Sequence, residues 1–264
     1  STGMPTYTAQ SDLHFALHAG QGEFPRLVVA PGDAEQAYTW SDLALRLSWK
    51  YQVPGVILCD KTLCEGFYSF SRPDATIPRI DQPTKASPGP GYSRYLFSEN
   101  GVSPLLSPPC TDTVIKVNGY THDQAGISTE NSEIAALMSE KRLKKAAALA
   151  SEVFSLNPVV VGGDTGSDVA LICWGSPIGV CREAAGSMGL RVVQPVVLSP
   201  LPTQLLQDAL QGIKRQIVVE ENAEGQLAML LARHGIRPNL HIRRYDGRPF
   251  TVEELEVRVR EALA

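Results

Sequence analysis

The first eleven residues of the chain carry five serine and threonine hydroxyl groups, from Ser1, Thr2, Thr6, Thr8 and Ser11. Gly3 and Pro5 lie among them, and this composition is typical of a loop. Hydroxyl groups in such a loop can donate hydrogen bonds to an anion, or they can cap a helix. On composition alone helix capping is favoured, because Asp12 and the apolar Leu13 follow directly.

Two adjacent carboxylates, Glu220 and Glu221, end a short apolar run and precede Asn222. Two carboxylates that share one proton can act as an acid–base pair. Neighbouring residues on a strand, however, point to opposite faces of the sheet. We therefore favour a structural role, in which an acid holds the N-terminus of the following helix.

Two glycine-containing segments, residues 162–166 and 174–179, have features of phosphate-binding loops. The first precedes the strand expected at 169–174, whereas a dinucleotide fingerprint follows its strand. The second follows that strand and opens a helix with Pro177 in its first turn, but it lacks the third glycine. Its helix N-terminus could hold an anion. The favoured interpretation is a tight strand-to-helix turn.

Metal binding has little support in this sequence. His14 and His18 have a spacing that can bind zinc on a helix, but no third ligand lies nearby, and His122 lies in a loop. No C-x-x-C pair occurs among Cys59, Cys64, Cys110, Cys173 and Cys181. We expect no metal site, and five free thiols in a reducing compartment, most of them buried in or beside strands.

The elements that would position these groups begin with a strand at 27–30, a helix at 34–50 and a strand at 53–60. Asp33 is the expected N-cap of the helix. The apolar residues of this helix include Tyr38, Leu45 and Trp49. A strand–helix–strand unit of this spacing has a parallel sheet, and it cannot cover both faces of that sheet by itself. We expect its missing strands to come from outside this chain.

Prolines dominate the stretch from about Glu65 to Thr111, and no helix tolerates that density. We expect an extended crossover that packs over a surface, because a freely disordered linker is poorer in aromatic residues. The aromatic residues concerned are Phe67, Tyr68, Phe70, Tyr92, Tyr95 and Phe97. A long helix is expected over residues 132–155, where apolar side chains recur at approximately helical spacing.

The remaining residues alternate between apolar strands and helices. Thr203 and Thr251 are expected helix N-caps. Strands are expected at 169–174, 190–193, 216–220 and 240–242, and helices at 175–188, 203–211, 225–234 and from 251 onwards. This repeat predicts a second, complete α/β domain with a mostly parallel sheet.

Composition excludes some classes of function. A net charge of −4 argues against binding to nucleic acid or to an anionic membrane surface. No stretch approaches the roughly 20 apolar residues of a membrane span, and no signal-peptide pattern is visible. The expected location is the cytoplasm.

The opening run resembles the S-T-G-L-P-T-x-x-E-Q-x-D-L segment of the α subunits of 2-oxoacid:ferredoxin oxidoreductases, although Met4 and Ala9 depart from it. Each further segment is a weak match alone, but their order and spacing over nearly the whole chain are specific. These segments are residues 22–26, 30–33, 60–65, 92–95, 100–104, 119–130, 141–142, 174–176, 220–222, 225–227 and 246–251.

The resemblance implies an α/β fold in three parts. Residues 1–70 would be the C-terminal part of a pyrimidine-type thiamine-diphosphate-binding domain. Residues 71–130 would be the extended, proline-rich crossover, and residues 131–264 a transketolase C-terminal-like domain with a mostly parallel sheet. The resemblance implies that this chain is the C-terminal part of such a subunit. The family's catalytic glutamate and an arginine precede the S-T-G loop, so both would lie upstream of Ser1.

The resemblance also implies an activity, the oxidative decarboxylation of a 2-oxoacid to an acyl-CoA with ferredoxin as electron acceptor. Thiamine diphosphate would lie between this subunit and a β subunit that carries the Mg²⁺-diphosphate site, and an iron–sulfur cluster would lie on a partner subunit. The expected partners are the β subunit, ferredoxin, the 2-oxoacid and CoA, in a dimer of heterodimers.

The family's substrate-facing loop is represented by Ser1, Thr2, Gly3 and Thr6, which the resemblance implies could hold the 2-oxoacid carboxylate. The alternative is a structural role for the same residues. The loop looks most like the 2-oxoglutarate branch, and the branched-chain oxoacid branch shares it closely. We expect no catalytic residue and no bound cofactor in this chain by itself, and its cofactor-binding residues stay unidentified.

Two other readings compete with an inactive fragment of this oxidoreductase subunit. One is part of a transketolase-like thiamine enzyme with no iron–sulfur partner. The other is a non-catalytic module whose C-terminal domain serves only dimerisation.

Overall fold

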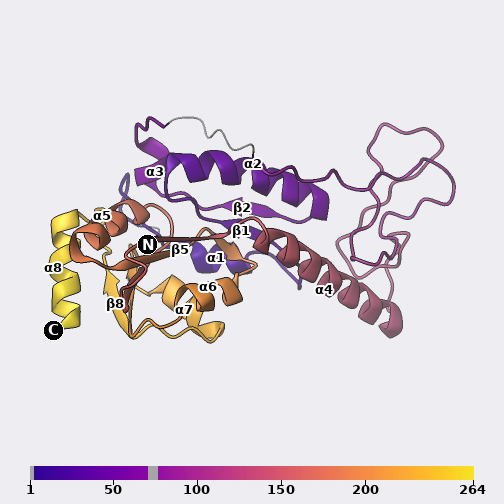
Figure 1. Ribbon diagram of the computed structural model, residues 1–264. Helices are drawn as coiled ribbons and strands as arrows, with labels where there is room; N and C mark the ends of the chain where they lie inside the picture. The colour runs from indigo at the N-terminus through magenta and orange to yellow at the C-terminus, as the bar shows by residue number, and fades with distance from the viewer. Residues whose placement is uncertain (1–2, 71–76) are drawn as a thin grey trace.

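The computed structural model describes residues 3–70 and 77–264. A small three-stranded sheet with strand order β2-β1-β6 lies beside a larger sheet (Figure 1). Its strands are β1 (Leu27–Val29), β2 (Gly55–Ile57) and β6 (Val197–Ser199). β1 runs parallel to β2, as expected, and antiparallel to β6. One neighbouring strand that was expected from outside the chain is therefore supplied by the chain itself, whereas β2 forms an edge with no further partner strand among the described residues. The sequence does not reveal β6 as a separate strand, because only residue 196 separates it from the strand that ends at Pro195, within one apolar run.

Helix α2 (Ala34–Tyr51) covers this small sheet, as Figure 1 shows. The Asp33 side chain accepts a hydrogen bond from the Gln36 amide at 2.8 Å, which confirms the predicted N-cap. The buried face of the helix consists of Trp40, Leu43, Ala44, Leu47 and Tyr51. The other face of the helix is exposed, and it includes three of the apolar residues named from the sequence, Tyr38, Leu45 and Trp49.

The long helix α4 (Ser132–Phe154) confirms the sequence prediction within one residue. Its C-terminal half packs on the small sheet, where Leu149 and Val153 share a core with α2. The middle of α4 contacts the crossover, where the buried Lys141 ammonium donates a hydrogen bond to Ser103 Oγ at 2.6 Å. Burial and the neighbouring cation Lys145 lower the pKa of the Lys141 ammonium to about 8.

The described part of the crossover after α3 (Lys61–Glu65) contains neither helix nor named strand, and it extends beyond the end of α4 in Figure 1. Tyr92 and Tyr95 are half-buried, as a packed crossover requires. Four of the six aromatic side chains are exposed instead, namely Phe67, Tyr68, Phe70 and Phe97. Aromatic content predicts packing against some surface, but it does not say that the same chain supplies that surface.

The larger sheet has five strands in the order β3-β5-β4-β7-β8. These strands are β3 (Val159–Gly163), β4 (Val169–Ile172), β5 (Arg191–Pro195), β7 (Arg215–Glu220) and β8 (Leu240–Arg243). β4, β5, β7 and β8 are parallel, which confirms the predicted sheet, and β3 joins the edge antiparallel to β5. β3 was missed because its two glycines suggested a loop.

Helices cover both faces of the larger sheet, and the strand period of two decides which residue faces which layer. On β4, Ala170 and Ile172 face one core, and Leu171 faces the other. The first face is covered by α1 (Leu13–His18), α6 (Thr203–Ala209) and α7 (Gln226–Arg233), and the second by α5 (Ile178–Met188) and α8 (Val252–Leu263). The opening helix α1 therefore belongs to the core of the larger sheet.

Helix starts differ in detail from the predictions. Thr251 accepts a hydrogen bond from the Glu254 amide at 3.2 Å and is the predicted N-cap of α8. Thr203 is not a cap, because it is the first residue of α6 and its hydroxyl donates backwards to the Leu201 carbonyl. Pro177 occupies the N-cap of α5. No helix among the described residues is long and apolar enough to cross a membrane.

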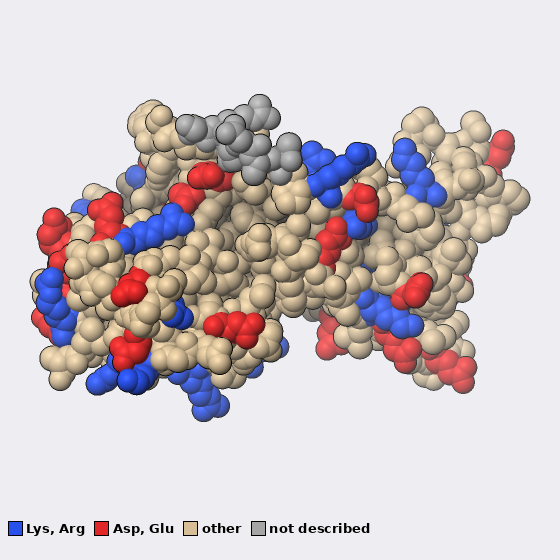
Figure 2. Space-filling model, viewed as in Figure 1, with Lys and Arg blue, Asp and Glu red and all other residues tan. Residues whose placement is uncertain are grey.

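Lysine and arginine are intermixed with aspartate and glutamate over the face shown in Figure 2, and neither sign of charge dominates it. All five cysteines are free thiols, as expected. Only Cys173 and Cys181 are buried, whereas Cys59 and Cys64 are exposed. The prediction of mostly buried thiols is wrong, because Cys59 follows the exposed edge strand β2.

Candidate site at the opening loop

The opening loop, residues 3–10, lies at the edge of the larger sheet where the parallel strands end. The Gln10 amide donates to the Glu221 carbonyl at 2.9 Å, and the Glu221 amide donates to Gln10 Oε1 at 2.8 Å. Gln10 Nε2 also donates to the Trp174 carbonyl at 2.6 Å, just after β4. Ligands of open α/β sheets bind outside the carboxyl ends of the strands, so this is the edge where a site is expected.

Ser1 and Thr2, two of the predicted substrate-binding residues, lie outside the described residues. Gly3 and Thr6 are exposed and have positive φ angles of 111° and 64°. A threonine seldom adopts that conformation, and such outliers cluster at ligand clamps and active sites. The Thr6 carbonyl accepts a hydrogen bond from Lys61 Nζ, at the start of α3. The site thus gains a cation to which sequence reasoning had assigned no role.

The loop after β8, residues 244–250, lies against the other side of the opening loop and is called the supporting loop below. A Cβ atom at Gly247 would lie 2.9 Å from Tyr7 Cβ and 3.1 Å from Met4 Sδ, so only glycine permits this approach. The Arg248 guanidinium carbon lies 3.8 Å from the centre of the Tyr7 ring. The Asp-Gly-Arg-Pro order is a turn signal, but nothing in the sequence identifies its partner across the fold.

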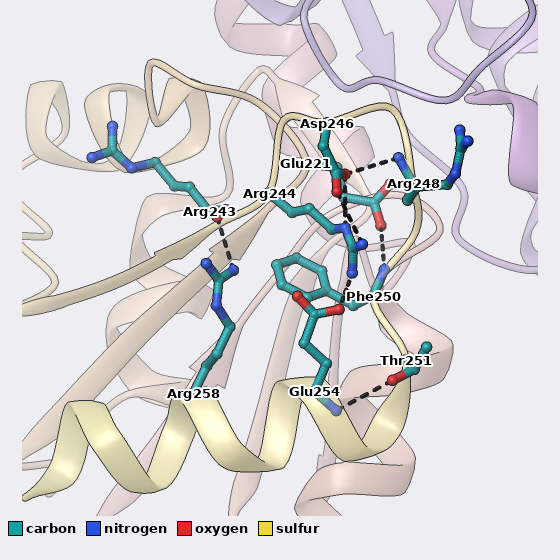
Figure 3. Close-up of polar contacts among 9 residues, drawn as sticks. All are labelled: Glu221, Arg243, Arg244, Asp246, Arg248, Phe250, Thr251, Glu254 and Arg258. Atoms are coloured by element: carbon teal, nitrogen blue, oxygen red, sulfur yellow. Dashed lines mark hydrogen bonds and ion pairs between the residues drawn. The ribbon is translucent and has the colours of Figure 1, made fainter.

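Arg244 braces this supporting loop (Figure 3). It forms a two-pronged ion pair with Asp246, at 2.8 and 3.0 Å, and a second ion pair with Glu254 of α8. Its hydrogen bond, together with one from the Arg248 amide, lowers the pKa of the Asp246 carboxyl to about 2. Asp246 is therefore ionised throughout the physiological pH range, and its ion pair with Arg244 persists over that range.

Glu220 has the structural role that the sequence favoured. Its buried carboxylate accepts the amides of Leu227 and Ala228 in the first turn of α7, at 2.7 and 3.1 Å. It also accepts Trp174 Nε1 at 3.3 Å and Asn222 Nδ2 at 2.8 Å. α7 has no capping side chain at its N-cap Gly225. Glu220 satisfies two of the helix donors from the strand, and Asn222 Oδ1 accepts a third, the Gln226 amide, at 3.2 Å.

Glu221 points to the opposite face, as the strand alternation predicted, and is only 3% exposed. Its Oε1 accepts the Phe250 amide at 3.2 Å (Figure 3), and its buried Oε2 has no hydrogen-bond partner among the described residues. Burial, together with the nearby carboxyl group of Asp60, raises the pKa of Glu221 to about 7. Sequence reasoning missed this group as a titrating acid, because burial is not readable from a strand end.

A small cavity of about 30 Å³ separates the opening segment from the first sheet. Residues 9–12, 58–60 and 174–175 line it. Asp60 is one of these lining residues, and it caps α3 by accepting a hydrogen bond from the Leu63 amide at 3.2 Å. The carboxyl edges of both sheets therefore meet around the opening loop.

The other candidates from the sequence lie elsewhere. Gly162 and Gly163 belong to β3, and residues 174–177 form the expected strand-to-helix turn, packed against Gln10. His18 Nδ1 contacts the His14 carbonyl at 2.9 Å, and His122 stacks on Tyr95 with ring centres 3.8 Å apart. No group of three or more His, Cys, Asp or Glu side chains within residues 3–70 and 77–264 could hold a metal ion.

A chain with two α/β units whose carboxyl edges converge on a hydroxyl-bearing loop has the architecture of a nucleotide-type or cofactor-type site. Residues 1–142 match the family model described as "Pyruvate flavodoxin/ferredoxin oxidoreductase, thiamine diP-bdg". This match covers more than half of the chain, and the chain belongs to that family.

Relatives with assigned names agree with this membership. The 2-oxoacid:ferredoxin oxidoreductase subunit alpha of Saccharolobus solfataricus is 35% identical over 266 residues, covering 97% of this chain and 42% of the relative. The 2-oxoglutarate oxidoreductase subunit KorA of Mycobacterium tuberculosis is 28% identical over 276 residues, covering 100% of this chain and 41% of the relative. This chain therefore spans less than half the length of these relatives.

A solved structure is similar in fold. It is a 2-oxoglutarate:ferredoxin oxidoreductase from Magnetococcus marinus with 2-oxoglutarate, coenzyme A and succinyl-CoA bound. The match has a TM-score of 0.83 and 28% identity, and it covers all of this chain and 47% of that chain. These comparisons confirm the predicted resemblance to the α subunits of 2-oxoacid:ferredoxin oxidoreductases and the α/β fold class.

Proposed function

We propose that this chain forms part of the α subunit of an enzyme that oxidatively decarboxylates a 2-oxoacid to an acyl-CoA, with ferredoxin as electron acceptor. The position of the opening loop, where the carboxyl edges of both sheets meet, carries the proposal. 2-Oxoglutarate is the proposed substrate, because the M. tuberculosis relative and the M. marinus structure bear its name.

In this proposal the opening loop holds the substrate carboxylate, through Ser1, Thr2, Gly3 and Thr6. The exposed positions of Gly3 and Thr6 support it, because an anion could reach their amide and hydroxyl groups. Lys61, at the Thr6 carbonyl, and Arg248, on the Tyr7 ring, add positive charge beside the loop. Two nearby cations favour the binding of an acid over a neutral substrate.

Thiamine diphosphate supplies the carbanion chemistry of 2-oxoacid decarboxylation. The polar, cation-flanked opening loop suits a site beside this cofactor. We place the cofactor between this subunit and a β subunit that would hold Mg²⁺ and the diphosphate, with an iron–sulfur cluster on a partner subunit. The proposed assembly is a cytoplasmic dimer of heterodimers that also binds CoA, and this chain alone would be inactive. The proposed divisions within the chain stay at residues 70 and 130.

The test is Thr6→Val in the assembled enzyme, because this change removes the hydroxyl group and keeps the shape of the side chain. We expect a loss of more than about tenfold in affinity for 2-oxoglutarate, as for an unpaired substrate hydrogen bond. The conservative variant Thr6→Ser should retain most of the affinity. An unchanged affinity in Thr6→Val would contradict the assigned role.

Thr8→Val is the matched control in the same loop. Thr8 is buried, and its hydroxyl group has no hydrogen-bond partner within residues 3–70 and 77–264, so the change should leave substrate affinity unaltered. Reduction of ferredoxin or a viologen dye by the assembled enzyme separates this proposal from a transketolase-like enzyme or a dimerisation module. Neither of these alternatives would transfer electrons to such an acceptor.

A further inference from the structure

We propose that Glu221 is a positioning residue for the opening loop, and that its side chain makes the affinity for the 2-oxoacid depend on pH. The inference about affinity rests on the proposed function, in which that loop holds the substrate. Glu221 would not touch the substrate itself. It would act through the two segments that support the loop from either side.

The backbone of Glu221 fastens the end of the opening loop. Both its amide and its carbonyl pair with Gln10, and Gln10 also reaches the Trp174 carbonyl. Residue 10 is thereby held by the ends of two adjacent parallel strands, β4 and β7. Residues 3–9 extend from this fixed point, so its orientation decides where Thr6 lies.

The side chain of Glu221 holds the supporting loop. Its Oε1 accepts the Phe250 amide, at the end of the segment that carries Gly247 and Arg248 (Figure 3). Gly247 lies against Tyr7 and Met4, and Arg248 packs on the Tyr7 ring. A shift of the Phe250 amide would therefore be transmitted to Tyr7, the neighbour of Thr6.

The charges that face Glu221 belong to the same two supports. Asp60 precedes α3, whose first residue Lys61 holds the Thr6 carbonyl. Asp246 lies in the supporting loop and, like Asp60, disfavours the ionised form of Glu221. Arg244 and the Phe250 amide favour the ionised form. The thiols of Cys173 and Cys181 lie on the α5 side of the sheet. The contact with Cys173 and burial raise the pKa of the Cys181 thiol, and Glu221 adds a smaller effect in the same direction.

Protonation of Glu221 therefore changes the repulsion on both supports at once. The neutral carboxyl group is compatible with Asp60 and Asp246, and its hydroxyl can turn toward an acceptor. The ionised group adds a buried negative charge whose Oε2 has no hydrogen-bond partner in the described part of the chain. Because the pKa of Glu221 is about 7, this change falls within the physiological pH range.

The experiment compares wild type, Glu221→Gln and Glu221→Ala in the assembled enzyme. KM and kcat for 2-oxoglutarate are measured between about pH 6 and pH 9, across the titration of Glu221. We expect the wild-type KM to rise at least about threefold through neutral pH, with little change in kcat. In Glu221→Gln, which cannot ionise, this rise should disappear. Glu224→Gln, an exposed acid three residues away, is the control and should keep the wild-type profile.

Hydrogen exchange of the peptide covering residues 3–10 gives a readout that is independent of substrate. We expect faster exchange in Glu221→Ala, because the Phe250 amide loses its acceptor and the supporting loop is released. If Thr6→Val leaves affinity unchanged while this exchange still rises, the substrate assignment fails and the positioning role stands. Identical pH profiles in wild type and Glu221→Gln, with unchanged exchange in Glu221→Ala, would overturn the inference.

Discussion

The raised pKa of Glu221 predicts how the stability of the chain depends on pH. In the folded chain this pKa is about 7, compared with an ordinary value of 4.5. At 1.36 kcal/mol for each pKa unit, this difference corresponds to about 3 kcal/mol. The residue is 3% exposed, so little solvent screening reduces the effect.

The sign follows from which state binds the proton more tightly. Below the ordinary glutamate pKa the carboxyl group is neutral in both the folded and the unfolded chain. As the pH rises toward 7, the unfolded chain ionises first, and the free energy of unfolding falls. Above the folded pKa the loss is complete, because the carboxyl group is then ionised in both states.

Glu221→Gln removes this titration and keeps the size of the side chain. We expect the free energy of unfolding of the variant, relative to wild type, to increase by about 3 kcal/mol from about pH 4.5 to pH 8.5. Urea unfolding followed by tryptophan fluorescence measures both proteins at each pH. Any constant difference from altered hydrogen bonding cancels, because only the change with pH is compared.

A relative stability of Glu221→Gln and wild type that stays constant over this range would refute the reasoning. It would mean that Glu221 titrates in the folded chain as it does in water, with its carboxyl group solvated despite its buried position. A relative stability that moved in the opposite direction would mean that Arg244 outweighs burial and Asp60.

Two further predictions concern stability and are also measured by urea unfolding. Glu220→Ala should lower the free energy of unfolding by about 4 kcal/mol, because it leaves four buried donors without their acceptor. The control Glu224→Ala, at an exposed position, should stay within about 0.5 kcal/mol of wild type. Equal effects of the two changes would contradict the helix-capping role of Glu220. Gly32→Ala should cost at least about 3 kcal/mol, since its Cβ would lie 2.3 Å from the Gly175 carbonyl oxygen. Gly179→Ala in α5 is the control, because no atom lies within 4 Å of the added Cβ, and it should stabilise the chain by about 0.5 to 1 kcal/mol. A similar loss of stability in Gly32→Ala and Gly179→Ala would show that steric contact does not cause the effect at Gly32.

Local patterns in the sequence predicted most of the secondary structure. Asp33 ahead of α2 and Thr251 ahead of α8 marked helix starts, because an N-cap bonds to amides only two or three residues away. The apolar runs of β4 and β7 identified buried parallel strands, because both faces of such strands are covered. The predictions for β3 and β6 failed where glycines and a continuous apolar run obscured the strand ends.

The candidate site was only half readable from the sequence. The opening run indicated where to look, through its hydroxyl groups and its resemblance to a known family. Its supports could not be read in the same way, because Gly247 and Arg248 are separated from Tyr7 by most of the chain. In the sequence Lys61 is only one residue of the matched segment 60–65, and nothing there indicates its hydrogen bond to the Thr6 carbonyl.

The sequence by itself determined the helix and strand types, the predominance of parallel strands and the family, because these depend on local composition and on the order of motifs. The tertiary structure alone decided that β6 adds a third strand to the first sheet, that Gln10 pairs with Glu221 across 211 positions, and that burial raises the pKa of Glu221 to about 7. Strand partners, burial and the charges around a carboxyl group arise from residues distant in the chain, and no local pattern encodes them.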